Sequence, residues 1–146
     1  MIAVMEKYTR LTDILLRFWD EFKEGPNPPA EKNINSEYFG DMWANCFLAK
    51  VVDEGKYKYS YLGDNLIEAC GDDFEKDEVE YLISNKGHRL VEKFDEAVKT
   101  GKPVSDDGEF VNSAKLLIKY RQMILPIKNS QGKIGYIFGG MRWKAF

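Results

Sequence analysis

Two apolar stretches near the end of the chain decide its fold: LLIKYRQMILPI (residues 116–127) and KIGYIFGGMRW (residues 133–143). Both are rich in the β-branched and aromatic residues that strands favour. The polar segment NSQG (residues 129–132) between them has the composition of a hairpin loop. The sequence therefore predicts a long antiparallel hairpin that closes the chain.

Three further strands and several helices precede this hairpin. Residues 47–52 and 56–62 are predicted to pair around Asp53-Glu54-Gly55, and residues 109–115 form a strand before the long pair. The segment KYKYSYL (residues 56–62) alternates tyrosines with polar residues, so we expect Tyr57, Tyr59 and Tyr61 to share one buried face. Helices are predicted at residues 66–70 and 78–84, and a longer one ends at Gly101 with Leu90, Val91, Phe94, Ala97 and Val98 on its apolar face.

The N-terminal segment predicts an amphipathic helix. Its apolar residues recur every three or four positions: Tyr8, Leu11, Ile14, Leu15, Phe18, Trp19 and Phe22. The stretch GPNPP (residues 25–29) ends the helix. Either the sheet of the same domain or the same helix of a second copy must cover this apolar stripe. We expect residues 1–33 to form the helix and its connector, and residues 34–146 to form the main domain.

These elements predict an α+β fold, a five-stranded antiparallel sheet with helices on one face and an N-terminal flanking helix. The chain has 146 residues and a net charge of −3, enough length for a core without disulfides or metals. It has no polybasic tract, which argues against nucleic-acid binding. Its N-terminus lacks the uninterrupted apolar run of a signal peptide or membrane span. We therefore expect a soluble, cytoplasmic protein that binds neither nucleic acid nor membranes.

Three short motifs, in this order of elements, make the chain resemble a PAS domain. They are YSYLGDNLIEACG (residues 59–71), the helix end Lys99-Thr100-Gly101, and YRQMILPI (residues 120–127) followed by Gly132-Lys133-Ile134. The resemblance covers about residues 34–143 and is nearest in style to short, stand-alone bacterial PAS-like proteins with an extra N-terminal helix. It implies a sensory or adaptor domain of signal transduction, with a ligand pocket between the inner sheet face and the long helix.

The cofactors of PAS domains find little support among the residues. Haem-binding members carry a histidine on the long helix where this chain has Leu90, and His88 would lie about 200° away around a helix. Flavin-binding light sensors use a cysteine motif that neither Cys46 nor Cys70 matches, so we expect two buried, inert thiols. The acidic stretch 72–78 lacks the spacing of a calcium loop. We expect no haem, flavin or metal, and the identity of any other cofactor stays unknown.

A generic small-molecule pocket fits the resemblance better. Alternation and helical phase select five candidates for its walls: Tyr61, Phe94, Tyr120, Met123 and Phe138. The same side chains would equally form a solid core. Arg121 is expected to face solvent in preference to a ligand carboxylate.

The function we expect is that of a stand-alone sensor or adaptor without an output domain and without enzymatic activity. It would bind a small molecule, signal through a protein partner, or do both. The N-terminal helix predicts a homodimer, and the interface candidates are Leu11, Leu15, Phe18, Trp19 and Phe22. Two alternatives stay open: a structural interaction module with no ligand, and a small-molecule enzyme with a cone-shaped α+β fold (NTF2-like). The enzyme would need an acid inside its cavity, whereas Asp95 and Glu96 lie on the polar side of their helix.

Overall fold

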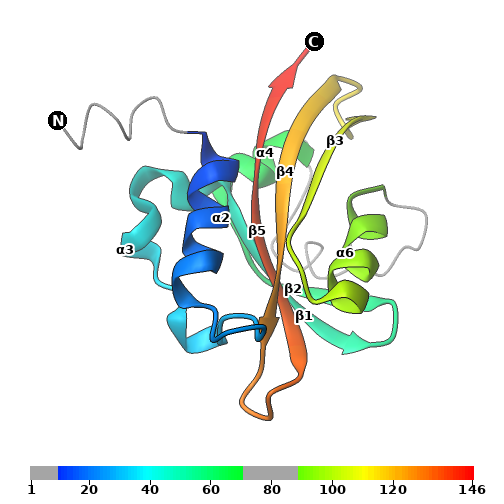
Figure 1. The fold of residues 1–146 in the computed structure, drawn as a ribbon. Coiled ribbons are helices and arrows are strands. Elements are labelled where there is room, and N and C mark those ends of the chain that lie inside the picture. Colours follow the sequence, from blue (N-terminus) through cyan, green and yellow to red (C-terminus); the bar gives the residue numbers. More distant parts are fainter. Residues whose placement is uncertain (1–9, 71–88) are drawn as a thin grey trace, which may run out of the picture.

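The computed structural model describes residues 10–70 and 89–146, and in it one antiparallel sheet of five strands lies between two layers of helices (Figure 1). The strands are β1 (Cys46–Asp53), β2 (Lys56–Leu62), β3 (Val104–Val111), β4 (Leu117–Lys128) and β5 (Ile134–Ala145). Their order across the sheet is β2-β1-β5-β4-β3. The last strand of the sequence is therefore the central one. The predicted five-stranded α+β fold is confirmed.

The predicted closing hairpin is also confirmed. The observed ends of β4 and β5 differ from the predicted ends by at most two residues. The side-chain oxygen of Asn129 stabilises the turn between the two strands, because it accepts hydrogen bonds from the backbone N–H groups of Gln131 (2.9 Å) and Lys133 (3.1 Å). Gly132 has a φ of +78°, which glycine adopts without strain.

Helices cover both faces of the sheet. The helix α2 (Leu11–Phe22) lies on one side, and α4 (Asp64–Cys70) and α6 (Arg89–Thr100) lie on the other (Figure 1). We use the names outer face for the α2 side and inner face for the α6 side. The short helices η1 (Glu31–Asn33), α3 (Ser36–Phe39) and η2 (Gly40–Asn45) connect α2 to β1. On the inner side, Trp143 Nε1 donates a hydrogen bond to the carbonyl oxygen of Asn65 (2.8 Å), which links α4 to β5.

The apolar stripe of α2 packs on the sheet of its own chain. A hydrogen bond across 107 residues of sequence anchors it, since Trp19 Nε1 donates to the carbonyl oxygen of Pro126 (3.1 Å). Pro126 lies beyond Ile124, the last residue of β4 that pairs with β3. No neighbouring strand on that side therefore requires the N–H group that proline lacks.

Two adjacent glycines in β5 leave space for close contacts, one with the neighbouring strands and one with α2. A Cβ atom at Gly139 would lie 2.1 Å from the carbonyl oxygen of Met123 and 2.8 Å from the ring of Phe47. A Cβ atom at Gly140 would lie 3.0 Å from side-chain atoms of Leu11 and Leu15. Gly139 therefore leaves space for the Phe47 ring of β1 on the inner face, and Gly140 leaves space for α2 on the outer face.

The predicted shared face of the three tyrosines is wrong because β2 contains a β-bulge. Tyr59 pairs with Ala49 and Tyr61 pairs with Leu48, so Ser60 is an extra residue in the ladder. The extra residue reverses the alternation. Tyr57 and Tyr59 contribute to the inner core, whereas Tyr61 packs in the outer one.

The predicted start of the third strand is also wrong. The strand begins at Val104, five residues before the predicted start at residue 109. The composition of VSDDG resembles a turn, but each residue from Val104 to Val111 pairs with β4, and this pairing outweighs local preference. The predicted helix of residues 78–84, the acidic stretch 72–78 and His88 lie outside the described residues.

Candidate functional site

A buried polar cluster on the inner face is the strongest candidate for a functional site. It consists of Asp106 on β3 and of Tyr120 and Gln122 on β4, and Asp106 lies directly opposite Gln122. Tyr120 Oη donates a hydrogen bond to Asp106 Oδ2 (3.1 Å), and Gln122 Nε2 donates one to the same oxygen (3.0 Å). Asp106 is 5% exposed and Gln122 is 2% exposed. The cluster is thus a carboxylate held inside the core by two side-chain donors.

Apolar side chains on the same face of β3 and β4 surround these polar groups. On β4, Ile118 and Ile124 flank the cluster, and on β3 Val104 and Phe110 do so, all four packed in the inner core. α6 lies over both strands. Burial of a carboxylate costs free energy unless hydrogen bonds compensate it, and even a well-paired buried charge is weak evidence of stabilisation.

The chemistry of the cluster suits a polar ligand. An aspartate carboxylate accepts hydrogen bonds, whereas the tyrosine hydroxyl and the glutamine amide can both donate and accept them. A hydroxyl, amide or amine that entered the inner face would find acceptors here. The aliphatic neighbours would contact its apolar part.

Aromatic side chains fill the part of the inner face below α6. The ring of Phe94 stacks on that of Phe47, with centroids 5.5 Å apart and planes 15° apart, and meets the ring of Tyr57 edge-on at 5.2 Å. Tyr57 Oη donates a hydrogen bond to Asp95 of α6. Burial, together with this hydrogen bond, raises the pKa of Tyr57, and burial raises the pKa of Tyr59. Both phenols therefore keep their protons at neutral pH.

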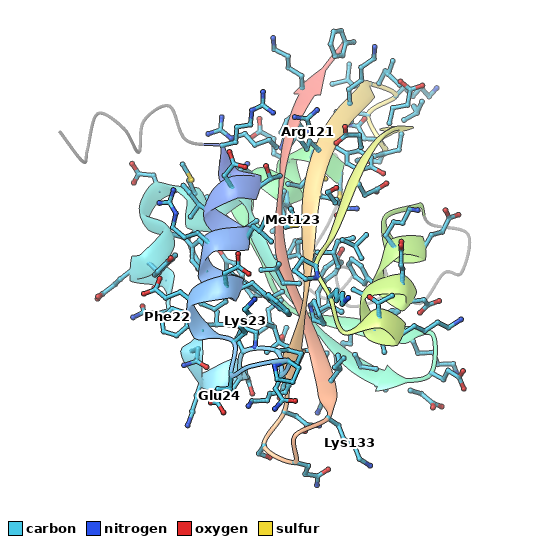
Figure 2. All side chains as sticks on the ribbon, viewed as in Figure 1. Phe22, Lys23, Glu24, Arg121, Met123 and Lys133 are labelled. Atoms are coloured by element: carbon cyan, nitrogen blue, oxygen red, sulfur yellow. The ribbon has the colours of Figure 1, made fainter. Side chains whose placement is uncertain are left out.

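The five predicted pocket residues do not lie together. Phe94 and Tyr120 are in the inner core, whereas Tyr61, Met123 and Phe138 are in the outer core beneath α2. Met123 is labelled in Figure 2. Met123 is three residues from Tyr120 and so faces the opposite side of the strand. Tyr61 is turned outward by the bulge at Ser60 and stacks on Trp43, with centroids 4.7 Å apart. One pocket cannot use all five side chains.

The sequence prediction missed Asp106 and Gln122. A signal for Gln122 was present, because it lies two residues from Tyr120 and therefore on the same face of an apolar strand. Asp106 carried no such signal, since it preceded the predicted start of its strand. Arg121, as expected, is exposed, and it pairs with Asp107 on the outer face.

The predicted dimer residues are largely covered within the chain itself. Leu11, Leu15, Phe18 and Trp19 are buried, and Phe22 is half-buried. The ring of Phe18 contacts those of Phe39 and Phe138, with centroids 5.5 and 5.6 Å apart. These side chains could contact a second copy only if α2 left the sheet of its own chain and docked on the sheet of the other copy.

Both cysteines are unpaired thiols, and Cys46 is buried as predicted, whereas Cys70 is only half-buried. Burial raises the pKa of Cys46 to about 12 and that of Cys70 to about 11, so both stay protonated at neutral pH. Among residues 10–70 and 89–146, no group of three or more His, Cys, Asp or Glu side chains is placed to hold a metal ion. In this part of the chain, none of the helices has the length and apolar character needed to cross a bilayer.

Solved structures with the same arrangement identify the fold, although no model of a protein family and no curated protein matches the chain. A light-oxygen-voltage domain studied with a flavin analogue matches with a TM-score of 0.55 and 12% identity, over 68% of this chain and 76% of that one. The PAS domain of the fruit-fly ELK potassium channel matches with a TM-score of 0.54 and 12% identity, over 73% of this chain and 91% of that one. The light-oxygen-voltage domain of the blue-light activated histidine kinase EL346 of Erythrobacter litoralis matches with a TM-score of 0.53 and 13% identity, over 70% of this chain and 96% of that one.

At such low identity these matches define an architecture and leave the ligand undefined. They agree with the sequence motifs quoted above and with the observed sheet. The cone-shaped alternative is therefore not the fold of this protein. The chain has the PAS fold.

Proposed function

We propose that this chain is a sensory or adaptor domain that binds a small molecule on its inner sheet face and transmits the bound state through protein contacts. The observation that carries the proposal is the buried cluster of Asp106, Tyr120 and Gln122. The matches to PAS and light-oxygen-voltage domains support a sensory role. The cluster indicates the chemistry of the ligand, which the fold alone does not.

The proposed ligand has an apolar body and at least one group that donates hydrogen bonds. The carboxylate of Asp106 would accept from that group. The body would lie against aliphatic side chains such as Ile118 and Ile124, which flank the cluster. A small site of this kind, with apolar walls and few polar groups, is typical of ligand pockets.

Native mass spectrometry of the freshly purified chain, compared with its denatured mass, tests this proposal. We expect an additional non-covalent mass. Asp106→Asn should weaken binding about tenfold or more and so lower the occupancy, because a hydrogen bond to a charged group contributes about 1.5–3 kcal/mol. Asp107→Asn is the matched control, since the neighbouring Asp107 is exposed on the outer face and should leave the occupancy unchanged.

Two results would refute ligand binding. One is a bare protein that no compound of a metabolite library stabilises against heat, although a bound ligand raises the melting temperature. The other is equal loss of the bound mass in both variants. A solid, ligand-free interaction module would then be the function to test with partner proteins.

A small-molecule enzyme is the second candidate, and the buried position of Asp106 is the observation in its favour. The acids considered from the sequence, Asp95 and Glu96, are exposed on α6. Incubation of the chain with the recovered compound separates the two functions. A sensor returns the compound unchanged, whereas formation of a product by the wild type and not by Asp106→Asn would identify an enzyme.

The homodimer and the cytoplasmic location also remain proposals. Exchange of α2 between two copies would form a dimer from the predicted interface residues without new contacts, as in other domain-swapped proteins. The free thiols of Cys46 and Cys70 fit a reducing compartment.

A further inference from the structure

The outer sheet face continues past the start of α2, and this part of it carries more basic than acidic side chains. β4 and β5 project beyond the helix (Figure 1), and Figure 2 shows Arg121 on the projecting part. Arg121 lies opposite Arg142, and Lys119 lies opposite Lys144. These four residues and Arg10, which directly precedes α2, are here named the basic patch. They line an open groove of about 590 Å³.

The basic patch is not a consequence of the overall composition, since the chain has a net charge of −3. Like charges directly opposite each other in an antiparallel pair are destabilising, and here two such pairs follow in consecutive rows. Asp107 neutralises Arg121 through two hydrogen bonds of 3.0 and 3.2 Å, and the exposed Glu109 of β3 lies opposite Lys119. Arg142 and Lys144 form no ion pair with any residue that the structure describes. Their charges are available to a partner.

An exposed apolar row lies next to the basic patch at the end of the sheet. Val111 pairs with Leu117, and the backbone N–H of Phe146 donates a hydrogen bond to the carbonyl oxygen of Leu117 (2.8 Å). Val111 is 64% exposed and Phe146 is 65% exposed. Lys119 Nζ lies 4.9 Å from the centre of the Phe146 ring, so the apolar row adjoins the lysine row.

These rows have the period of an extended peptide. Residues two apart on a strand share a face and lie about 6.6–6.8 Å apart. The arginine, lysine and apolar rows follow one another at this interval along β4, at Arg121, Lys119 and Leu117. An extended chain would present acids at positions i and i+2 to the two basic rows and an apolar side chain at i+4 to the third.

We propose that the basic patch and the apolar row bind an extended acidic segment of a partner protein. A long polyanion such as nucleic acid is disfavoured, because the net negative charge of the chain repels it outside the patch. A short segment needs only local complementarity. The charged side chains of this surface lie on the opposite face of the sheet from Asp106, and the groove also reaches Tyr120.

Fluorescence anisotropy with the full chain tests the proposal. The probe is a fluorescein-labelled peptide, Thr-Glu-Thr-Glu-Thr-Leu-Thr, and the matched control peptide is Thr-Glu-Glu-Thr-Thr-Leu-Thr. The control has the same charge but turns one acid away from the surface. We expect the probe to bind more tightly than the control, and its affinity to fall as NaCl screens the exposed charges.

Variants of the chain locate the binding surface. The double change Arg142→Glu and Lys144→Glu should weaken binding about tenfold or more. The neutral double change Arg142→Gln and Lys144→Gln should weaken it by an intermediate factor. Lys50→Glu is the control for one charge reversal away from the patch, and it is compared with Arg142→Glu alone. Lys50 is an exposed outer-face lysine opposite Lys58, and it pairs with Tyr136, six residues along β5 from Arg142. Circular dichroism confirms that each variant is folded.

Several outcomes would overturn the proposal. Absence of probe binding would do so, as would equal weakening by Lys50→Glu. Equal affinity for the two peptides would also refute the predicted spacing. Tighter binding of an oligothymidylate of the same charge would assign the surface to phosphate backbones instead.

Discussion

Single residues decide how closely neighbouring groups pack against β5, and Gly139 is the clearest case. It leaves space for the ring of Phe47 on the adjacent strand β1, whereas its neighbour Gly140 faces Leu11 and Leu15 of α2. Neither Gly139 nor Gly140 has a positive φ. Both are therefore required for space and not for backbone conformation.

Gly139→Ala is expected to destabilise the chain by about 3 kcal/mol, at the upper end of overpacking effects. The added Cβ would lie 2.1 Å from a backbone oxygen of Met123, which cannot move without disturbing β4. Gly140→Ala should have a smaller effect, about 1 kcal/mol, because the nearest atoms are 3.0 Å away and two of the three belong to leucine side chains. Urea denaturation measures both, and a larger effect at Gly140 would contradict this account.

The buried thiol of Cys46 makes stability depend on alkaline pH. Burial raises its pKa from the ordinary 9.0 to about 12, so the folded state retains the proton to higher pH than the unfolded chain does. The resulting stabilisation is complete below pH 9 and is lost as the pH rises towards 12. Urea denaturation at several pH values should therefore show the difference between wild type and Cys46→Ala narrowing above pH 9, by up to about 1.4 kcal/mol per pH unit. A difference that stays constant from pH 8 to 11 would show that Cys46 does not titrate in this way.

Among the secondary-structure elements, those with strong internal patterns could be predicted from the sequence. The hairpin of β4 and β5 has long apolar strands and a polar loop, and the stripe of α2 has a regular helical period. Tyr61 and Asp106 could not be placed, because their positions depend on pairing between strands. The bulge at Ser60 and the early start of β3 are visible only once β1 and β4 are aligned with their neighbours. Of the three residues of the candidate site, the sequence therefore predicted Tyr120 alone.

The attachment of α2 to the sheet depends on Trp19. Trp19→Phe should reduce the free energy of unfolding by about 1–3 kcal/mol, because it leaves the carbonyl of Pro126 without its buried donor. Trp43→Phe is the control, since the indole N–H of Trp43 bonds to no residue in the described part of the chain and the ring stacking on Tyr61 is kept. Chemical denaturation of both variants measures the difference. Equal losses would mean that ring packing, and not the hydrogen bond, holds the helix.

The whole molecule is a three-layer structure in which α2 covers an apolar sheet face. A chain that starts at residue 34 tests whether the predicted boundary at residue 33 separates an independent domain. We expect it to aggregate or to lose its near-ultraviolet circular dichroism, because Leu125, Ile127 and Phe138 would be exposed. A cooperative thermal transition in this shortened chain would instead establish that residues 34–146 fold alone.

The same packing changes the expected result of mutating the predicted dimer residues. Phe18→Glu places a charge in the core and should unfold the chain, whereas Leu16→Glu alters a residue of α2 that is 37% exposed and should leave the fold intact. Light scattering with circular dichroism distinguishes unfolding from dissociation. A folded, monomeric Phe18→Glu variant of a dimeric wild type would favour direct pairing of helices over packing within one chain.

The positions of the tryptophans give each layer its own optical reporter. Trp19 of α2 donates a hydrogen bond to Pro126 of β4, and Trp143 of β5 donates one to Asn65 of α4. A chain that keeps Trp19 alone emits from the outer layer, and one that keeps Trp143 alone emits from the inner layer. Changes in emission wavelength and quenching can therefore be assigned to one side of the sheet, so that the arrival of a compound and the response of the opposite layer can be timed separately.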